Sequence, residues 1–531
     1  MKIKIEKKYL LLPTGHHAQK KRIEFFEDSN LIYDVDAELD FITPDYISYL
    51  DMKRFIGKTV DIKITPSIDF PYSLKQTDET DDTGIYHEKE RPQFHFSAKR
   101  GWINDPNGLV YYRGKYHLFF QHNPIYRFWG NMQWGHAVSN DLIHWEQKDT
   151  AIFPDETGIV ASGSGFVDTK NLTGLKNGDH DPILLFFSSG GDVTNLSKGK
   201  PWEQHIAYSL DGGETFVRYE KNPIIKQMVW GNRDPKIIYC DELSKYLMIF
   251  YYNNNEYQIM SSDNLLEWHN YDRIAIEGDC ECPDLYPLYL DGDNSKRRWI
   301  LTGAADRFVI GTFENGKLKL NNPAKPLRYG NWGYAAQTFS NIPESDGRRI
   351  RISWNNQGSP LSIFNNCMNI PTEMSLKTIC GQEHLCSYPV SEFSILYEKT
   401  DTISDVELLS GENFCHTLDT ESGYDVMITL KAEENSNIEF SIFGLSFTCS
   451  IKDNALKIWD QTAPLYAEDG QFTLRFIFDR SCFEIFVDKG QAYLCGSTMP
   501  DFNINRLTAC SNGGNANIIS AQISKVKSIW K

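Results

Sequence analysis

The sequence predicts an all-β protein built from more than one domain. Its 531 residues are too many for a single core, so two or three domains are expected. Two observations predict the fold class. Aromatic residues make up 13% of the chain, which suits strands and sugar-binding surfaces alike. Strand-like alternation also recurs along the chain without long helical periodicity, which disfavours an α/β barrel.

The two ends of the chain predict separate β domains. Residues 1–76 carry short alternating runs, among them IYDVDAELDF and KTVDIKI, and predict a small β domain. Residues 77–92 are polar and acidic and include a Gly and a Pro, so a linker or exposed loop is expected. Alternation returns over residues 391–531, as in NIEFSIFG and FTLRFIFDRSCFEIFVDKG, and predicts a β-sandwich.

The middle of the chain, residues 93–390, contains a repeat. Five times a polar or acidic turn opens onto a strand, a short turn and a second apolar strand, with copies that begin NDPNGLVYY, GSGFVDTKN, RDPKIIYC, CPDLYPLYL and YAAQTFSN. A repeat of roughly 50 to 60 residues, made of strands and turns alone, is typical of propeller blades. The sequence therefore predicts a five-bladed β-propeller, followed by the β-sandwich and preceded by the small N-terminal β domain.

Three acidic residues occupy the same phase of this repeat. Asp105 lies in GWINDPNG, Asp234 in RDPK and Glu281 in ECPD, each at or just before the start of an inner strand. Inner strands border the channel of a propeller, so the three carboxylates are expected to face one pocket. The alternatives are a simple Asp-Pro turn and, for Arg233 with Asp234, a structural ion pair. The shared phase favours a functional site.

Carboxylates that flank a glycosidic bond can hydrolyse it, one as nucleophile and the other as acid and base. Crowding raises the pKa of at least one of them. Glu281, between two cysteines and a proline, is expected to have the raised pKa of a general acid. Asp105, beside Asn104 and turn amides, is expected to stay ionised as a nucleophile. Asp234, next to Arg233, is expected to stay charged and to bind sugar hydroxyls.

Composition excludes several partners. A net charge of −17 disfavours nucleic acid, and no segment approaches the ~18 apolar residues of a membrane helix. The eleven cysteines lack metal-ligand spacing and predict free thiols in a reducing compartment. The N-terminal MKIKIEKKYLLLP has no apolar run of signal-peptide length, so a cytoplasmic location is expected if this start is native. The two flanking β domains offer surfaces for a homo-oligomer.

An ordered set of motifs resembles glycoside hydrolase family 32, which contains invertases, inulinases, levanases and related fructosyltransferases. The motifs are GWINDPNGL, FFQHNP, WGNMQWGHAVSNDLIHW, SGSGFVD, RDPKI, ECPDLYPL, YAAQTF and DRSCFEIFVDKG. The resemblance covers residues 93–531 and implies a five-bladed propeller with a β-sandwich, retaining cleavage of β-fructofuranosides, and no metal or cofactor. Residues 1–76 resemble an accessory β domain that precedes the catalytic part of some bacterial fructan-degrading members.

The same resemblance implies roles for individual residues. Asp105 matches the nucleophile, Glu281 the acid/base and Asp234 the transition-state stabiliser. The positions that match the sugar pocket are Asn104, Gln121, Trp129, Ser164, Arg233, Tyr334 and Gln337.

The expected activity is that of an exo-acting β-fructofuranosidase whose partner is a small sugar, sucrose or a short fructo-oligosaccharide such as inulobiose. A fructosyltransferase and a levan- or inulin-degrading fructanase stay open as alternatives. An arabinofuranosidase on a five-bladed propeller is disfavoured by the WINDPNG, RDP and ECPD set. A non-catalytic sugar-binding protein is disfavoured because all three carboxylates are present. The sequence leaves the choice between β-2,1 and β-2,6 linkages open.

Overall fold

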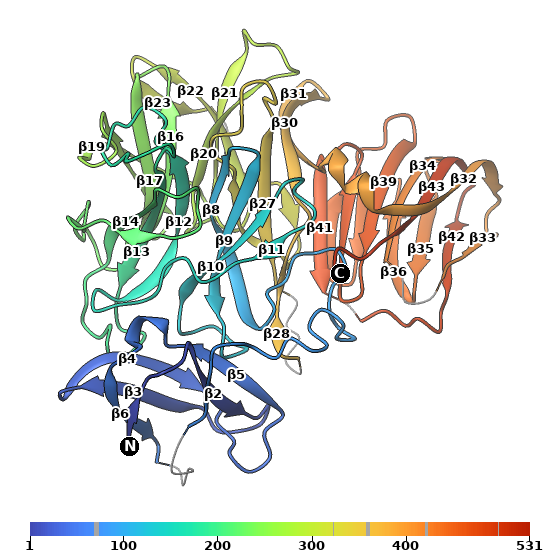
Figure 1. The fold of residues 1–531 in the computed structure, drawn as a ribbon. Coiled ribbons are helices and arrows are strands. Elements are labelled where there is room, and N and C mark those ends of the chain that lie inside the picture. Colours follow the sequence, from blue (N-terminus) through green and yellow to red (C-terminus); the bar gives the residue numbers. More distant parts are fainter. Residues whose placement is uncertain (68–73, 322, 357–361, 420–422, 498, 531) are drawn as a thin grey trace.

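The computed structural model describes residues 1–67, 74–321, 323–356, 362–419, 423–497 and 499–530. Within these residues the chain forms strands and two short 3-10 helices, Lys53–Phe55 (η1) and Ser391–Leu396 (η2), which confirms the all-β prediction (Figure 1). Neither of these helices has the length and apolar character needed to cross a membrane.

The N-terminal part consists of two small sheets around one core. Burial alternates along the strands, as in β2 and β6, because successive side chains point to opposite faces. Leu10, Phe25, Val35 and Ile62 are among the buried residues that both sheets contribute. One sheet has the order β1 (Lys2–Lys4), β6 (Thr59–Thr65), β3 (Lys21–Glu27), β4 (Asn30–Ala37), and the other has β5 (Tyr46–Asp51), β2 (Tyr9–Thr14), β7 (Gln76–Thr77).

The described residues of the middle part form five antiparallel sheets whose strands are stacked in sequence order. Their first strands are β8 (Gly101–Tyr112), β12 (Ile159–Val167), β16 (Arg233–Cys240), β20 (Asp284–Tyr289) and β26 (Tyr334–Thr338). Each contacts the next in this order, and β26 contacts β8, so the five first strands form a closed ring. A ring of radial sheets around a channel is the architecture of a β-propeller, and Figure 1 shows these sheets from cyan to yellow.

The strands of the five propeller sheets have the following bounds. The first sheet contains β8 (Gly101–Tyr112), β9 (Lys115–Asn123), β10 (Gln133–Ser139) and β11 (Glu146–Gln147). The second contains β12 (Ile159–Val167), β13 (Ile183–Gly190), β14 (Glu203–Ser209) and β15 (Val217–Arg218), and the third contains β16 (Arg233–Cys240), β17 (Lys245–Asn253), β18 (Glu256–Ser262) and β19 (His269–Ala275). The fourth contains β20 (Asp284–Tyr289), β21 (Arg297–Thr302), β22 (Arg307–Glu314), β23 (Lys317–Leu320) and β24 (Lys325–Pro326). The fifth contains β26 (Tyr334–Thr338), β27 (Arg349–Asn355), β29 (Cys367–Met368), β30 (Thr372–Ile379) and β31 (Gln382–Pro389).

Backbone bonds close the ring between the fifth sheet and the first. The short strand β28 (Phe364–Asn365) pairs in parallel with the first two residues of β8. Farther along β8, Tyr111 N–H donates to the Ser340 carbonyl at 3.0 Å, and Ser340 N–H donates to the Leu109 carbonyl at 2.9 Å. The first strand of the propeller is therefore bonded at two places along its length to the part of the chain that forms the fifth sheet.

A turn motif recurs where the third strand of a sheet leads to the fourth. Asp141, Asp211 and Asn264 each accept two backbone N–H bonds, between 2.8 and 3.1 Å long, with one side-chain oxygen. Short polar side chains that bond to the backbone a few residues ahead stabilise such turns. The turns account for the recurrence of SNDLIHW, SLDGGETF and SSDNLLEW in the sequence.

The C-terminal part is a sandwich of two antiparallel sheets that share a large apolar core. One sheet has the order β41 (Ala492–Ser497), β40 (Cys482–Val487), β39 (Gln471–Phe478), β34 (Gly423–Ala432), β43 (Ala516–Val526), β32 (Tyr397–Leu408), with β25 (Arg328–Tyr329) of the propeller chain added in parallel to β41. The other has β33 (Asn413–Thr417), β42 (Arg506–Asn512), β35 (Asn437–Ile442), β36 (Leu445–Ser450), β37 (Ala455–Ile458), β38 (Gln461–Pro464).

Buried polar contacts fix the sandwich to the propeller. His95 lies fully buried between the two, with Nδ1 2.9 Å from Asp479 and Nε2 3.1 Å from Glu484. In the segment predicted as a linker, Tyr86 stacks on Trp530 with ring centroids 3.9 Å apart, and Trp530 Nε1 donates to the Pro92 carbonyl. Residues 77–92 are therefore held against the C-terminal end of the chain.

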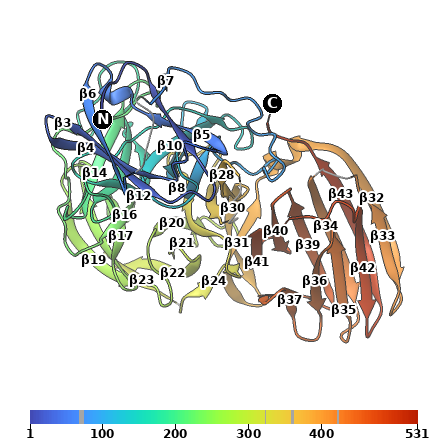
Figure 2. The same ribbon diagram turned by 90° about the horizontal axis from the view of Figure 1, so that it is seen from below.

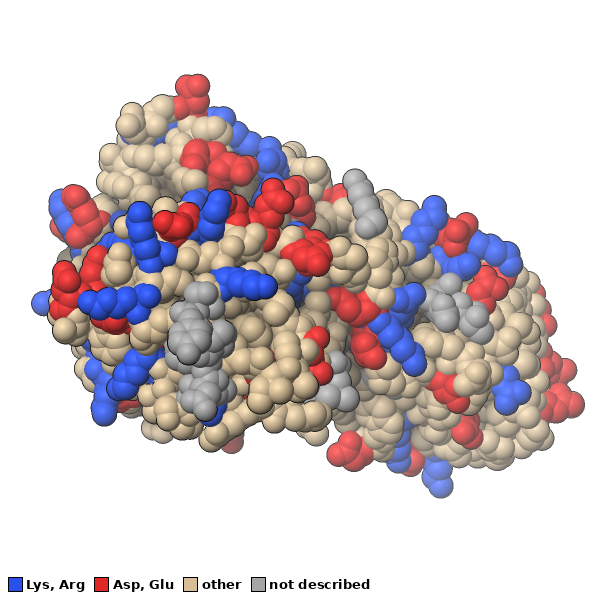
Figure 3. Space-filling view, turned by 60° about the horizontal axis from the view of Figure 1, so that its bottom comes forward, with Lys and Arg blue, Asp and Glu red and all other residues tan. Residues whose placement is uncertain are grey.

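The N-terminal sheets lie against the first two propeller sheets, as Figures 1 and 2 show from two directions. On the face in Figure 3, basic and acidic side chains are interspersed. Ion pairs at the surface of the molecule include Lys58 with Glu27 and Lys8 with Asp149.

Candidate active site

The first strands of four propeller sheets carry a β-bulge near their start, where two residues face one residue of the second strand. The bulges place Asn104–Asp105 opposite Gln121, Ala161–Ser162 opposite Ser188, Asp234–Pro235 opposite Phe250, and Ala335–Ala336 opposite Ser353. A bulge bends its strand and redirects a side chain. The repeated bulge therefore aims side chains from several sheets at one end of the central channel.

The three predicted carboxylates meet at this end of the channel. Cys282 joins two of them, because its Sγ lies 3.5 Å from Asp105 Oδ2 and 3.5 Å from Asp234 Oδ2. Its backbone N–H also donates to Asp234 Oδ2 at 3.1 Å. Because both Oδ2 atoms lie 3.5 Å from the same sulfur, the two Asp oxygens are separated by no more than twice that distance. Glu281 precedes Cys282 directly, in the segment that leads into β20.

Backbone strain accompanies this arrangement. Asp234, Glu281 and Cys282 have φ values of +66°, +58° and +33°, a region that residues other than Gly, Asn and Asp seldom adopt. Such strain is found most often at functional sites, where the surrounding structure holds it in place. The Asp234 N–H is anchored by Ser188 Oγ at 2.9 Å.

Two side chains hold Glu281. Arg233 Nη2 donates to Oε1, and the Tyr334 hydroxyl donates to Oε2 at 2.7 Å. Arg233 is less well placed for Asp234, since its Nε lies 3.7 Å from Oδ2. The guanidinium also lies over the Tyr251 ring, 4.5 Å from its centroid. Arg233 therefore makes a direct hydrogen bond with Glu281 and a longer ion pair with Asp234.

The electrostatics of the three acids differ from the sequence-based expectation. Burial raises the pKa of Asp234 to about 7, and the nearby Glu281 and Asp105 charges add to the rise against the effect of Arg233. Burial also raises the pKa of Asp105, although Ser162 and Asn104 hydrogen bonds oppose it.

For Glu281, burial raises the pKa, but Arg233 and Tyr334 more than offset it, so the pKa lies below its usual value. The prediction of a raised pKa for Glu281 is therefore wrong for this state of the site. Adjacent residues in the sequence did not indicate that Arg233, which lies 3.7 Å from its neighbour Asp234, also donates to Glu281.

Three predicted sugar-binding residues lie around the carboxylates, and two of them, Gln121 and Gln337, have polar atoms without a partner among the described residues. Asn104 Nδ2 donates to Asp105 Oδ1 at 3.1 Å, and its own Oδ1 accepts from Trp102 Nε1 at 2.8 Å. Gln121 is buried, and neither its Oε1 nor its Nε2 has a partner among the described residues. Gln337 donates to the Gly163 carbonyl, while its Oε1 has no partner there. Buried amides without partners are expected to receive hydrogen bonds from a ligand or water.

Ser164 and Ser162 have different surroundings. Ser164 is fully buried, and its hydroxyl accepts the Ile237 N–H at 3.1 Å, which links β12 to β16. Ser162 Oγ donates instead to Asp105 Oδ2 at 2.6 Å. Sequence reasoning selected Ser164 and missed Ser162 and the bridging role of Cys282. The repeat phase could have identified Ser162, because it stands in the bulge of the second sheet as Asp105 does in the first. A sugar-binding role for Ser164 stays a prediction.

Aromatic rings and a cavity border the Glu281 side of the cluster. Trp354 makes edge contacts with Trp102 and Tyr334, at centroid distances of 5.7 and 6.4 Å. A cavity of about 540 Å³ lies beside them, lined in part by Tyr334, Trp354, Asn331 and Arg307. Predicted Trp129 lies in the connection between β9 and β10, and its side chain is 51% exposed.

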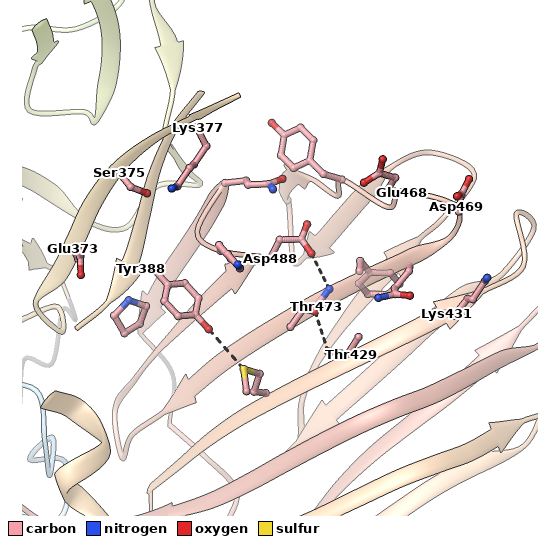
Figure 4. Close-up of a pocket in the computed structure, with 17 residues that line it drawn as sticks. Glu373, Ser375, Lys377, Tyr388, Thr429, Lys431, Glu468, Asp469, Thr473 and Asp488 are labelled. Atoms are coloured by element: carbon pink, nitrogen blue, oxygen red, sulfur yellow. Dashed lines mark hydrogen bonds between the residues drawn. The ribbon is translucent and has the colours of Figure 1, made fainter. Parts of the chain in front are cut away.

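A second cavity lies elsewhere. It measures about 970 Å³ and is formed between the fifth propeller sheet and the sandwich, with Glu373, Tyr388, Asp488 and Lys431 among its lining residues (Figure 4). The three carboxylates do not line it. Its size does not make it the chemical centre, because it lacks a group of acids held together as Asp105, Asp234 and Glu281 are.

One group with metal-ligand spacing was found in the described part of the chain. The ligand atoms of His95, Asp479 and Cys482 lie within 4.8 Å of one another. They are buried between the propeller and the sandwich, and both ring nitrogens of His95 already contact carboxylates. The carboxylates of the candidate site are not part of this group.

Comparisons with known proteins show the family and the fold. The domain described as "Glycosyl hydrolases family 32 N-terminal domain" matches residues 95–389, and "Glycosyl hydrolases family 32 C terminal" matches residues 445–525. A levanase of Bacillus subtilis (strain 168) is 29% identical over 496 residues, which cover 85% of this chain and 72% of the levanase. An extracellular exo-inulinase of Aspergillus awamori is 28% identical over 520 residues, which cover 84% of this chain and 96% of the inulinase.

The crystal structure of the exo-inulinase from Aspergillus awamori is similar to this fold, with a TM-score of 0.74 at 25% identity. The similarity covers 84% of this chain and 100% of the inulinase chain. The family match spans both the propeller that carries the three carboxylates and most of the sandwich. This chain belongs to glycosyl hydrolase family 32.

Proposed function

We propose that the protein is an exo-acting, retaining β-fructofuranosidase that removes terminal fructose from sucrose or short fructo-oligosaccharides such as inulobiose. The observation that carries the proposal is that Asp105 and Asp234, from two propeller sheets, both contact the thiol of Cys282. The third acid, Glu281, is the residue directly before that cysteine. Similarity to a levanase and an exo-inulinase supports a fructoside as substrate.

In the proposed reaction Asp105 attacks the anomeric carbon of the terminal fructose as the bond to the leaving oxygen breaks. Glu281 donates a proton to that oxygen, so the leaving sugar departs neutral. A covalent fructosyl–Asp105 ester forms. Glu281, now ionised, takes a proton from water, and the resulting nucleophile releases fructose and restores Asp105. Asp234 binds ring hydroxyls as positive charge develops on the sugar.

The proposed reaction needs a proton on Glu281, whereas the surroundings of the three acids favour a proton on Asp234. Near neutral pH, Asp234 is the acid whose pKa of about 7 retains a proton. Sugar hydroxyls that donate to Asp234 would favour its ionised form, and those that accept from Arg233 would weaken its hold on Glu281. Both changes move the proton toward Glu281, where the leaving oxygen needs it.

The leaving sugar is assigned to the cavity beside Glu281. Tyr334 both donates to Glu281 and lines that cavity. Trp354 supplies a ring on the same side. A flat ring suits a sugar, which presents an apolar face to it.

Product analysis on four substrates tests the proposal: sucrose, inulobiose, levan and an arabinofuranosyl oligosaccharide, with products separated at early times. Free fructose from sucrose and inulobiose, with little from levan, is the expected result. Longer sugars made from sucrose would assign fructosyl transfer instead, and rapid release from levan would assign a fructanase. Arabinose without fructose would overturn the proposal. The anomeric configuration of newly released fructose, followed by NMR, tests retention.

A further inference from the structure

The connection between β9 and β10, residues 124–132, is referred to here as the aromatic loop. It begins three residues after Gln121, which faces the Asp105 bulge. Second strands end where first strands begin, as the pairing of Asn123 with Trp102 demonstrates. The aromatic loop therefore lies at the end of the channel that carries the carboxylates.

Four contacts tie the aromatic loop to the N-terminal sheets. Asn131 pairs with the backbone of Asp36, since its Oδ1 accepts the Asp36 N–H and its Nδ2 donates to the Asp36 carbonyl, both at 2.8 Å. Ser48 Oγ donates to the Ile125 carbonyl at 3.0 Å. Arg127 contacts Glu38 at 3.4 Å and donates to a backbone carbonyl of the same domain.

Apolar packing adds to these bonds. Ile125 is 1% exposed and belongs to the core of the N-terminal sheets, although it lies in the propeller chain. Burial of one isoleucine side chain is worth about 1.5–3 kcal/mol. The aromatic loop is thus part of the fold of the N-terminal domain as much as of the propeller.

The propeller holds the other side of the loop. Asn123 Nδ2 donates to the Phe128 carbonyl at 2.9 Å, and Asn123 Oδ1 accepts from Asn131 at 3.1 Å. Asn365, on the strand that pairs with β8, donates to the Arg127 carbonyl at 2.9 Å. The backbone of the loop is bonded from both sides.

Two large rings of the loop are nevertheless left open. Trp129 is 51% exposed and Phe128 is 38% exposed, whereas Arg127 and Asn131 on either side are 4% and 8% exposed. A fixed backbone that presents exposed rings at the channel end is an arrangement suited to binding the face of a sugar.

The N-terminal domain also fixes the equivalent connection of the second sheet. Asn195, between β13 and β14, donates its backbone N–H to Asp34 at 2.7 Å and its Nδ2 to Glu24 at 2.9 Å. One domain thereby ties down the connections of two adjacent sheets at the end of the channel that carries the carboxylates.

We propose that the N-terminal domain is a positioning element for the active site, which holds the aromatic loop so that Trp129 meets the bound sugar. Asn131 and Ser48 act as positioning residues in this respect, without touching substrate. The kinetic consequence of this inference rests on the proposed function. The contacts by which the N-terminal domain holds the loop do not depend on that function. If the N-terminal domain no longer holds the loop, Trp129 loses its contact with the sugar. That contact is equally strong in the ground state and in the transition state, so its loss raises KM and leaves kcat unchanged.

Asn131→Gly and Ser48→Ala test the proposal from the two sides of the contact. Asn131 has φ +47°, so glycine keeps the backbone while removing the side-chain bonds. The matched control is Asn171→Gly, the same change at φ +51° in an exposed turn remote from the N-terminal sheets. The first readout is tryptic cleavage after Arg127, followed as fragments 1–127 and 128–531 by mass spectrometry. Both test variants are expected to be cut there faster than wild type, and the control is not.

The second readout is steady-state kinetics on sucrose. Asn131→Gly and Trp129→Ala are each expected to raise KM about three- to ten-fold, the loss of one aromatic contact, with kcat unchanged. The double variant should raise KM no further than Trp129→Ala alone, because both changes remove the same contact. Additive effects, equal loss in kcat, or a loop that stays resistant to trypsin in both variants would overturn the proposal. If wild type turned over none of the fructosides, the proposed function would fail while the trypsin result still decided the hold on the loop.

Discussion

Two clusters in this molecule gather carboxylates around one cation, and they differ in how completely those carboxylates are satisfied. Between propeller and sandwich, His95 contacts Asp479 and Glu484, and all three are buried. Asp479 also accepts backbone N–H bonds from Gln93 at 2.7 Å and Phe94 at 3.0 Å, and Glu484 accepts one from Ile370. Burial lowers the pKa of His95, but contacts with its acidic and thiol neighbours raise it well above its usual value.

At the channel end, Arg233 contacts two of the three acids, Glu281 and Asp234. Arg233 is bonded to Glu281, Asp234 receives one backbone N–H, and Asp105 receives donors from Ser162 and Asn104. The Cys282 thiol adds a long contact to each of the two aspartates. The pKa of Asp234 accordingly rises to about 7. Carboxylates with all their hydrogen bonds made keep a fixed charge and join two domains. Carboxylates with fewer hydrogen bonds can gain and lose protons, as acid–base chemistry requires.

The largest expected effect is at Asp105, and it separates chemistry from structure. Asp105→Asn keeps the size and hydrogen-bonding capacity of the side chain but removes the nucleophile. kcat on sucrose is expected to fall at least about a thousand-fold, with the thermal midpoint within a few degrees of wild type. Parallel calorimetry and assay check this. A variant that retains a tenth of the wild-type kcat would contradict the assignment.

His95→Ala should lower the stability of the protein by disrupting the cluster between propeller and sandwich, and should leave kcat unchanged. It strands two buried carboxylates, so the free energy of unfolding is expected to fall by about 3–5 kcal/mol, measured by urea denaturation at pH 6. The pKa of His95 is raised in the folded state, so its stabilisation is complete below the unfolded value and is lost as pH rises through the folded one. The difference from wild type should therefore narrow at alkaline pH. A fall in kcat with unchanged stability would contradict this reading.

Asp234→Asn should lower activity and raise stability at once. The folded protein binds the Asp234 proton more tightly than the unfolded chain does, so this acid favours folding at low pH and loses that effect as pH rises toward 7. Removal of the charge is expected to stabilise the protein by about 1–2 kcal/mol at pH 8 and not at pH 4. Thermal unfolding at the two pH values measures the difference. An equal change in stability at the two pH values would show that the folded protein does not raise the pKa of Asp234.

The smallest expected effect contrasts two serines two residues apart. Ser162→Ala removes one hydrogen bond to Asp105, so kcat/KM is expected to fall about ten-fold, near 1.4 kcal/mol. Ser164→Ala leaves the Ile237 N–H without its acceptor and should instead lower stability by about 1–3 kcal/mol. Assay and denaturation of both variants give the comparison. If Ser164→Ala impaired catalysis more, the sequence-based choice of Ser164 would be restored.

Much of this architecture could be predicted from the sequence because it depends on local patterns. Alternation predicts the strands, and the phase of the repeat predicts that Asp105, Asp234 and Glu281 converge. Side-chain direction is set by tertiary contacts instead. The turn of Arg233 toward Glu281 depends on the path of the segment before β20, which no local pattern encodes. The contact of Asn131 with Asp36 joins residues 95 positions apart, beyond the range of periodicity or turn chemistry.

The closure of the propeller has a consequence for how the enzyme would lose activity on heating. The strand that carries Asp105 is also the strand on which the ring closes, through β28 and the Ser340 backbone bonds. Separation at this seam would move the strand that carries Asp105 even while the contacts between the other sheets stayed in place. Amide hydrogen exchange at Tyr111 and Ser340 would then follow inactivation more closely than it follows loss of total β-structure. If a bound sugar protects the protein from heat, hydrogen exchange should slow first at the amides of Tyr111 and Ser340.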